Sequence, residues 1–165
     1  MAAAYILVGN TGAGKSTYAA RLAKRLRAHV FANDEWMRTL FFPDMPDPPD
    51  YEWALERTQR IERLVCAEAL KLMALDVDVI LDLGFFAKEQ RDRVLSFFTE
   101  KDAPAEMHYL DVDKTTRWAR VEERNRGLSD TFQFEVDRET FDFCETIFEP
   151  LDEDERARSV IVDAS

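Results

Sequence analysis

The sequence predicts one α/β domain in which helices flank a five-stranded parallel β-sheet. Longer segments of helical periodicity alternate with short apolar or β-branched runs at residues 3–9, 29–33, 76–84, 105–113 and 158–164. The run at 76–84 is almost continuously apolar, which is typical of a strand buried on both faces. This alternation favours a parallel sheet with right-handed crossovers. No repeat or linker divides the 165 residues, so we expect a single domain over residues 1–165.

The segments between these strands carry the signals of helix starts and ends. We expect helices at residues 15–28, 34–42, 51–75, 87–101, 114–126 and 139–151. Asp50 and Asp113 are placed to cap the third and fifth helices, and Gly127 to end the fifth. The Pro- and Asp-rich residues 43–50 predict a loop. One stripe of the last helix, which includes Cys144, is expected to lie in the core.

Composition narrows the class of protein. The formal net charge is −11, which disfavours a nucleic acid as the main partner without excluding one. No apolar run reaches the ~18 residues of a membrane span, so no membrane partner is expected. The N-terminal residues predict a first strand rather than a signal peptide, and we expect a cytoplasmic protein. Neither cysteine has a histidine at zinc-ligand spacing.

The first strand leads into VGNTGAGKST, which matches the phosphate-binding pattern G-x-x-x-x-G-K-[ST] at every fixed position. The glycines allow successive N–H groups to point at a phosphate, and the following helix adds the positive end of its dipole. Lys15 is expected to reach the β- and γ-phosphates of ATP. The residues predicted to bind the nucleotide are Gly9, Asn10, Thr11, Gly12, Ala13, Gly14, Lys15, Ser16 and Thr17.

A magnesium site is predicted from two oxygen ligands. Ser16 follows the phosphate-loop lysine, and Asp82 ends the strand at 76–84, where open α/β sheets bind their ligands. The alternative for Asp82 is a turn residue at the strand end.

A phosphate loop serves hydrolases as well as kinases. The sequence lacks the guanine-binding Asn-Lys-x-Asp pattern, and the chain is short for a motor ATPase. A small kinase needs a base, cations around the transferred phosphoryl group and a cover that excludes water. Asp34, after the second strand, is the candidate base, with Glu35 as its competitor and Arg38 as an anchor for the acceptor. Asp34 is equally suited to cap the helix at 34–42.

Cations and a cover are predicted in RWARVEERNR. Arg117, Arg120 and Arg124 share one face of a helix, which suits a polyphosphate, and the segment at about 114–131 would close as a lid. The alternative is an ordinary solvated helix.

The acceptor is harder to read from the sequence. Arg57 and Arg60 lie on a second stripe of the helix at 51–75 and would bind the substrate, or they form salt bridges with Glu56, Glu62 or the acidic residues of the 44–50 loop. Phe85 and Phe86, after Asp82, would line an apolar part of the same pocket or belong to the core.

The segments VGNTGAGKST, ANDEWMR, VILDLGF, RWARVEERNRG and FEPLDEDE together resemble the small predicted kinases of the AAA-type ATP-binding group. These are similar to the kinase domain of polynucleotide kinase, chloramphenicol phosphotransferase and the zeta toxins. The resemblance implies a three-layer P-loop NTPase fold with strand order 2-3-1-4-5, ATP–Mg²⁺ as donor and a short arginine-rich lid. It implies catalytic roles for Arg120 and Arg124. In polynucleotide kinase the arginine lies three residues after the base; Arg38 lies four after Asp34 and three after Glu35, so both carboxylates stay candidates.

The leading hypothesis is therefore an ATP-dependent kinase that phosphorylates a hydroxyl of a small or nucleotide-like molecule. Lys15, Asp34, Arg120 and Arg124 would be the catalytic residues, and Arg117 would help to bind the nucleotide. The alternatives are an ATP-binding or ATP-hydrolysing switch and a polynucleotide 5′-hydroxyl kinase.

Overall fold

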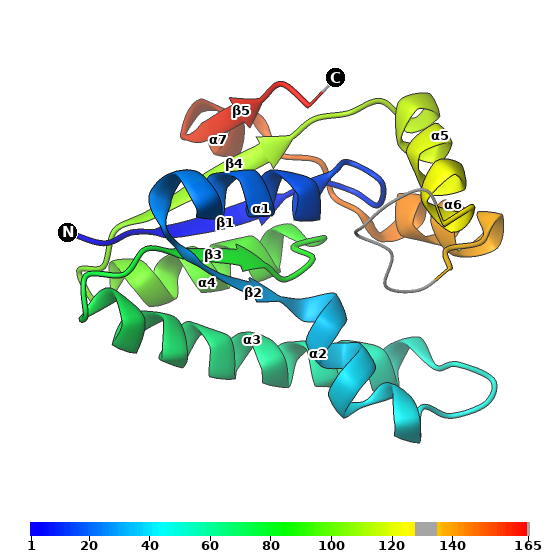
Figure 1. Cartoon of the computed structure of the whole chain (residues 1–165), viewed down its shortest axis with the longest axis horizontal. Helices are drawn as coiled ribbons and strands as arrows, with labels where there is room; N and C mark the ends of the chain where they lie inside the picture. The colour runs from blue at the N-terminus through cyan, green and yellow to red at the C-terminus, as the bar shows by residue number, and fades with distance from the viewer. Residues whose placement is uncertain (128–134, 165) are drawn as a thin grey trace.

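The computed structural model describes residues 1–127 and 135–164, which form a three-layer α/β fold (Figure 1). One parallel sheet in the order β2-β3-β1-β4-β5 forms the middle layer. Its strands are β1 (Ala4–Val8), β2 (His29–Ala32), β3 (Val79–Asp82), β4 (Ala105–Leu110) and β5 (Ser159–Val162). Both the predicted fold class and the strand order implied by the family resemblance are confirmed.

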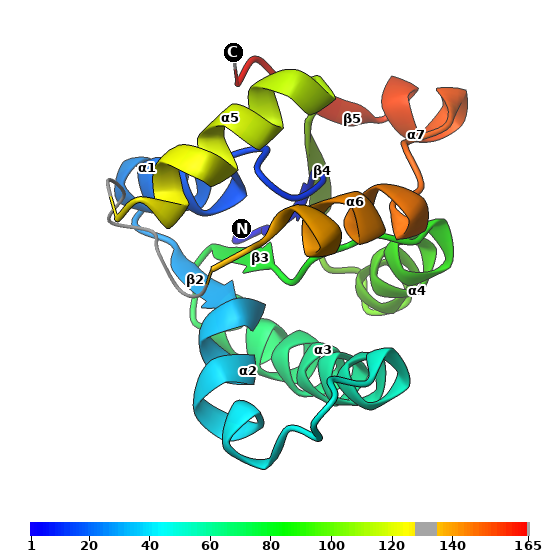
Figure 2. The ribbon, with the colours of Figure 1, turned by 90° about the vertical axis from the view of Figure 1, so that its right-hand side faces the viewer.

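Helices cover the two faces of the sheet and the carboxyl ends of its strands (Figures 1 and 2). On one face, α1 (Lys15–Leu26) packs Leu22 against Leu7 and Ile80 of the sheet. The other face packs against α3 (Tyr51–Met73) and α4 (Lys88–Thr99). The remaining helices are α2 (Asn33–Leu40), the 3₁₀ turn η1 (Phe42–Asp44), α5 (Lys114–Asn125), α6 (Arg138–Ile147) and α7 (Glu153–Ala157). Among the described residues, no helix is both long enough and apolar enough to cross a membrane.

Two of the predicted helix caps are present. The Asp50 carboxylate accepts hydrogen bonds from the N–H groups of Glu52 and Trp53 at 3.2 and 3.3 Å. Asp113 accepts from the N–H of Thr116 at 3.0 Å. These bonds satisfy amides that have no partner inside the helix.

The predicted last helix, 139–151, extends too far, because α6 ends at Ile147. The separate helix α7 begins at Glu153 with a capping box, in which the side chains of Asp152 and Glu155 accept hydrogen bonds from each other's backbone N–H groups. Pro150 disfavours helical geometry at Glu149, which is instead held by a 2.9 Å bond from its N–H to the Phe86 carbonyl. The apolar stripe continued past the point at which the backbone could stay helical.

Arg91 of α4 ties the segment after β3 to the C-terminal part of the chain. Its fully buried guanidinium donates to both carboxylate oxygens of Glu155, at 2.7 and 3.0 Å. Another of its nitrogens donates to the carbonyls of Phe86 and Glu149 at 3.1 and 2.9 Å. A planar donor fork suits this arrangement, which a lysine would not reproduce. These hydrogen bonds of Arg91 therefore fix the path of the chain between β3 and α4.

Replacing Arg91→Met should destabilise the protein by about 3–5 kcal/mol, because it leaves the Glu155 carboxylate buried without its partner. Urea denaturation followed by circular dichroism measures this loss. Lys71→Met, which breaks an exposed ion pair with Glu68, is the matched control and should cost less than about 1 kcal/mol. Equal effects of the two substitutions would contradict this role of the buried pair.

Candidate active site

The loop between β1 and α1 leaves the start of α1 without a side-chain cap. Gly12 and Gly14 have φ values of 82° and 92°, in the left-handed region that glycine adopts without strain. Gly14 occupies the cap position of α1, and no side chain caps the helix. The first N–H groups of α1 are thus left for a ligand, as in sites that bind phosphate at a helix N-terminus.

Helix α5 lies directly on this loop. A Cβ atom at Gly12 would come within 2.5 Å of the Arg117 carbonyl oxygen, a distance that real Cβ atoms do not reach. Gly12 is therefore required both by its backbone conformation and by the approach of α5.

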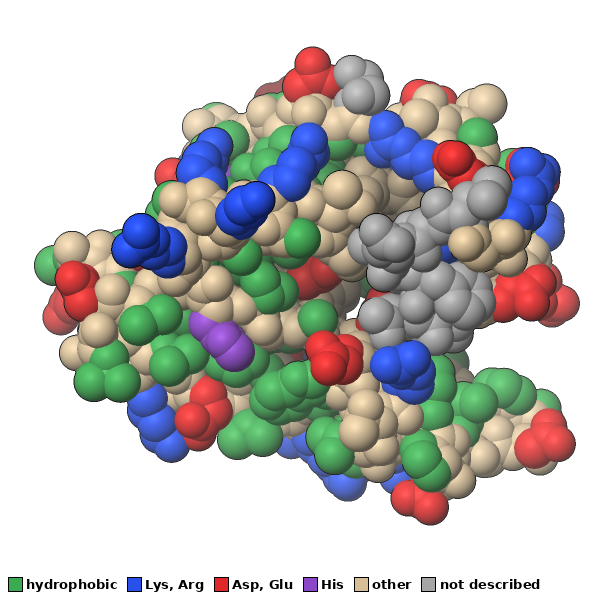
Figure 3. All heavy atoms as spheres, viewed as in Figure 1, with side chains coloured by type: hydrophobic (Ala, Val, Ile, Leu, Met, Phe, Trp, Pro, Cys, Tyr) green, Lys and Arg blue, Asp and Glu red, His purple; other side chains and the backbone are tan. Residues whose placement is uncertain are grey.

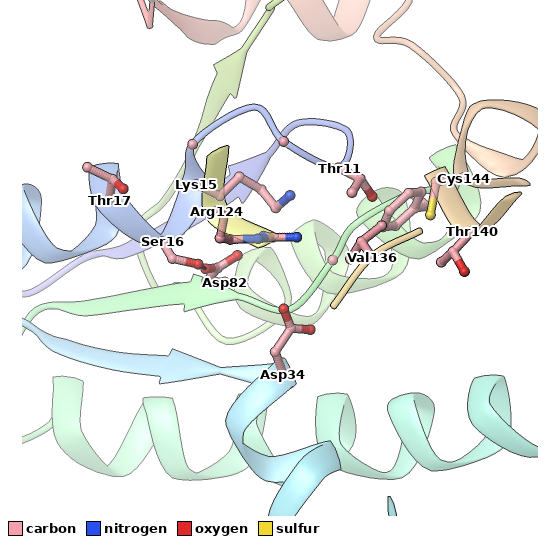
Figure 4. A pocket seen from close by; sticks show the side chains of 14 residues that line it. Thr11, Lys15, Ser16, Thr17, Asp34, Asp82, Arg124, Val136, Thr140 and Cys144 are labelled. Atoms are coloured by element: carbon pink, nitrogen blue, oxygen red, sulfur yellow. Dashed lines mark hydrogen bonds between the residues drawn. The ribbon is translucent and has the colours of Figure 1, made fainter. Parts of the chain in front are cut away.

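Behind the loop, the predicted metal ligands lie together. The Ser16 hydroxyl donates to Asp82 Oδ2 at 3.0 Å, and Asp82 is largely buried at the end of β3. Lys15 Nζ donates to the Gly9 carbonyl at 2.8 Å and points into the site (Figure 4). Among the described residues, no group of three or more His, Cys, Asp or Glu side chains is arranged to hold a metal. A hydroxyl and one carboxylate fit Mg²⁺, which keeps several waters and binds phosphate oxygens.

A cavity of about 270 Å³ lies in front of the loop. Its walls include Lys15, Ser16 and Asp82 on one side and Val136, Thr140 and Cys144 near α6 on the other (Figure 4). Cys144 is half-buried against this cavity rather than buried in the core as the sequence suggested. Its spacing from Thr140, one helical turn away, was a signal that both side chains share a face, but the sequence did not show what that face meets.

Asp34 lies at the edge of this cavity, opposite the loop (Figure 4). The interpretation of Asp34 as a helix cap is wrong: Ala32 takes the cap position, and Asp34 belongs to the first turn of α2. Its side chain is exposed to solvent where the cavity opens, while the surrounding protein atoms partly desolvate the carboxyl group. This burial raises the pKa of Asp34, the nearby Asp82 carboxylate raises it further, and the charges of Lys15 and Arg124 oppose both effects.

The predicted arginine stripe divides into two kinds of residue. Arg124 lines the cavity, and its charge interacts with that of Asp34. Burial lowers the pKa of Arg124, and the Asp34 carboxylate opposes this shift. Arg117 and Arg120 do not line the cavity.

Instead, Arg117 and Arg120 bind carbonyl oxygens of the phosphate loop from behind. Arg117 is buried and donates to the Thr11 carbonyl at 3.2 Å and to Glu145 Oε1 at 2.7 Å. Arg120 donates to the Ala13 carbonyl at 3.3 Å. In this structure they hold the loop and α5 together. The predicted lid at 114–131 coincides with α5 over residues 114–125, and its residues 128–131 lie outside the described residues.

The other candidates for substrate contacts lie away from the cavities. Glu35 and Arg38 are exposed on α2, and they line neither the cavity in front of the phosphate loop nor the cavity next to it. Arg57 stacks on Trp53, with its guanidinium carbon 4.0 Å from the ring centroid, and both Arg57 and Arg60 pair with Glu56. The salt-bridge interpretation of these two arginines is the one the structure supports.

A second cavity, of about 330 Å³, adjoins the first. It lies among α3, the segment from β3 into α4, and the end of α6; Figure 2 shows how these elements are arranged. Asp34, Gly84 and Phe86 line both cavities. The sequence pointed to Phe86 but not to Leu55, Gln59 or Ile147, because their patterns are those of ordinary amphipathic helices.

A family model described as an AAA domain matches residues 5–151. The chain belongs to this family. No curated protein matches it significantly.

Solved structures share the fold of this AAA-domain protein. A sugar kinase from Janibacter sp. is 15% identical with a TM-score of 0.67, and the match covers 99% of this chain and 86% of that chain. Kti12 of Chaetomium thermophilum, in complex with ADP-AlF3, is 15% identical with a TM-score of 0.69, covering 96% and 88%. The APS kinase CysC of Mycobacterium tuberculosis, in complex with AMPPNP and APS, is 14% identical with a TM-score of 0.57, covering 81% and 76%. At these identities the likeness shows a P-loop NTPase fold.

Replacing Gly12→Ala should destabilise the AAA-domain protein more than Gly127→Ala does. Both glycines have positive φ, so each alanine should cost about 1–2 kcal/mol of backbone strain. Only at Gly12 does the new Cβ also meet a backbone carbonyl; at Gly127 nothing lies within 4 Å. Thermal unfolding of the two variants measures the difference, and a Gly127→Ala variant as unstable as Gly12→Ala would contradict the close approach of α5.

Replacing Asp34→Asn should stabilise the ligand-free protein at neutral pH. Because the folded-state pKa of Asp34 is raised, its ionisation costs folding free energy as the pH rises from about 4 through that raised value. The asparagine removes this cost; because Asp34 is exposed to solvent, which screens its charge, the gain should stay below about 1 kcal/mol, or below roughly 2–4 °C in melting temperature.

The gain should vanish below about pH 4, where Asp34 of the unmodified protein is protonated in both the folded and the unfolded state. Melting curves from pH 4 to pH 8 are the measurement, with Glu35→Gln on the same turn as control. A loss of stability at neutral pH would mean that Lys15 and Arg124 outweigh the burial of the carboxylate.

Proposed function

We propose that this protein is an ATP-dependent phosphotransferase that moves the γ-phosphoryl group of ATP to a hydroxyl group. The observation that carries the proposal is the position of Asp34. Its carboxyl group lies where the cavity of the phosphate loop joins the second cavity. A phosphoryl donor in the first cavity and an alcohol in the second would meet at this residue.

On the donor side, the uncapped N–H groups at the start of α1 would bind the phosphates, with Lys15 beside them. Ser16 and Asp82 would hold Mg²⁺, which neutralises charge on the phosphates when bound. Arg124 brings a fixed guanidinium charge to the same cavity. Such preorganised charges stabilise a transition state in which negative charge is spread over the phosphoryl oxygens.

On the acceptor side, Asp34 would act as general base. It takes the proton of the acceptor hydroxyl while that oxygen forms a bond to the γ-phosphorus and the bond to the β-phosphate oxygen of ATP breaks, releasing ADP. A carboxylate with a raised pKa is a stronger base, provided that it is ionised at the working pH. Glu35, which lines neither cavity, is less suited to this role.

Similar folds that carry kinase names agree with this proposal. They include the Janibacter sugar kinase, the Mycobacterium tuberculosis APS kinase and a gluconokinase from Sinorhizobium meliloti. They support phosphoryl transfer as the reaction class. The acceptor has to be inferred from the residues of this chain. The acidic net charge and the pairing of Arg57 and Arg60 with Glu56 do not favour a polynucleotide acceptor.

Replacing Asp34→Asn should lower acceptor-dependent formation of ADP and phosphate ester by about 10²–10⁴-fold, because it removes the base. The rate of the unmodified protein should fall as the pH drops through the raised pKa of Asp34. A screen of alcohols with γ-labelled ATP, followed by kinetics on any acceptor found, is the measurement. Glu35→Gln should stay within about twofold of the unmodified rate.

The nucleotide switch is the competing function, and the same assay separates the two. A kinase gives ADP formation that depends on the acceptor. Phosphate release that no alcohol in the screen accelerates, and that Asp34→Asn leaves unchanged, would favour the switch and overturn the kinase.

A further inference from the structure

The second cavity has mostly apolar walls. Six of the residues that face it are Ala54 and Leu55 of α3, Leu83, Phe86 and Ala87 of the connection into α4, and Ile147 of α6. Tyr51 also lines it and packs edge-on against Phe143, with ring centroids 5.4 Å apart, so that an aromatic pair links α3 to α6. Thr58 and Gln59 add uncharged polar groups. Apolar walls with a few neutral polar groups suit an acceptor with an apolar body.

The positive charge among the described residues of this cavity is already paired with a buried carboxylate. Arg93 is the one Lys or Arg among the described residues that line it. Its Nε donates to Glu62 Oε1 at 2.9 Å, and Gln90 donates to Glu62 Oε2 at 2.9 Å. Glu62 is only 3% exposed. An anion that drew Arg93 away would leave a buried carboxylate without its cation, which is strongly destabilising.

The remaining charges repel an anion. Asp34 and Glu89 line the cavity and carry negative charge when ionised. Residues 128–134, outside the described part of the chain, contain no Lys or Arg in their sequence. The basic side chains that gather over α1 in Figure 3 belong to a helix whose Arg21, Lys24 and Arg25 line neither cavity.

We propose that the phosphoryl acceptor is an uncharged alcohol with an apolar body. Anionic acceptors such as sugar phosphates and sugar acids are excluded because Arg93 already pairs with Glu62. This inference rests on the proposed function. It separates this protein from an enzyme that binds an anionic acceptor such as APS, the molecule bound in the Mycobacterium tuberculosis structure. Specificity here comes from the negative charges of Asp34 and Glu89 and from the pairing of Arg93, the one Lys or Arg among the described lining residues, with Glu62.

A matched pair of probes tests the inference. The alcohol p-xylylene glycol and the anion p-(hydroxymethyl)benzoate share a ring and one hydroxymethyl group and differ in charge at the other end. Binding to the full-length protein is read from the methyl NMR signals of Ala54, Leu55 and Ile147, and transfer from labelled ATP. We expect the glycol to shift these signals and to exceed the benzoate in kcat/KM by about 100-fold or more.

Two substitutions on α3 test the role of Arg93. Glu62→Gln removes the carboxylate that holds Arg93 and should raise binding of the benzoate at least about tenfold, because the cation becomes available. Glu56→Gln, which frees only Arg57 and Arg60 outside the cavity, is the matched control and should leave the preference unchanged. Gln59→Arg, which adds a cation to the wall, should act like Glu62→Gln if the latter fails to fold.

The outcomes separate the inference from the proposed function. A benzoate that binds or reacts better than the glycol overturns the inference and leaves the kinase intact. The inference also fails if neither probe shifts the three methyl signals. Binding of the glycol alone, without transfer to any alcohol, supports the charge selection of the cavity and counts against the kinase.

Discussion

The buried pair of Arg91 and Glu155 fixes the part of the chain on which both cavities depend. The Arg91 guanidinium also holds the carbonyls of Phe86 and Glu149, so one side chain joins the end of β3, α4 and the C-terminal helix. Phe86 lines the cavity of the phosphate loop as well as the neighbouring one. A shift of this segment would change the boundary between them. The pair therefore sets the geometry of the site, although it contacts neither cavity itself, and a buried ion pair of this kind is better explained by position than by net stability.

Charge in the site is arranged as two cations facing two carboxylates. Lys15 and Arg124 face Asp34 and Asp82, and the pKa of Asp34 is raised because burial and the second carboxylate outweigh both cations. A base in this state is held back from ionisation in the free protein and is correspondingly reactive toward a hydroxyl proton. In the mechanism that we propose, the desolvation that costs folding free energy also makes the Asp34 carboxylate a stronger base, a trade between stability and activity that is common at active sites.

The sequence predicted what depends on local patterns and missed what depends on how helices meet. Strand order followed from a family resemblance, and the phosphate loop from its spacing. In contrast, the helical spacing of Arg117 and Arg124 predicts one shared face, but their surroundings differ. Arg117 is buried against backbone carbonyls, and Arg124 faces the cavity. Periodicity assigns a face to a residue, but the depth at which a side chain meets a neighbouring element depends on packing. The helix at 139–151 was predicted from its apolar stripe alone, although Pro150 stands within that range.

The missing side chain of Gly12 explains why one arginine of α5 faces the phosphate site while another does not. Because the loop has no Cβ at this position, the backbone of α5 at Arg117 packs against it directly, and the Arg117 side chain must then turn aside to Val112, Thr11 and Glu145. Arg124 lies two helical turns further along the same face, beyond the edge of the loop, where the cavity opens. Gly12 thus permits the close approach of α5 to the loop, and this approach helps to set where the cation of Arg124 lies.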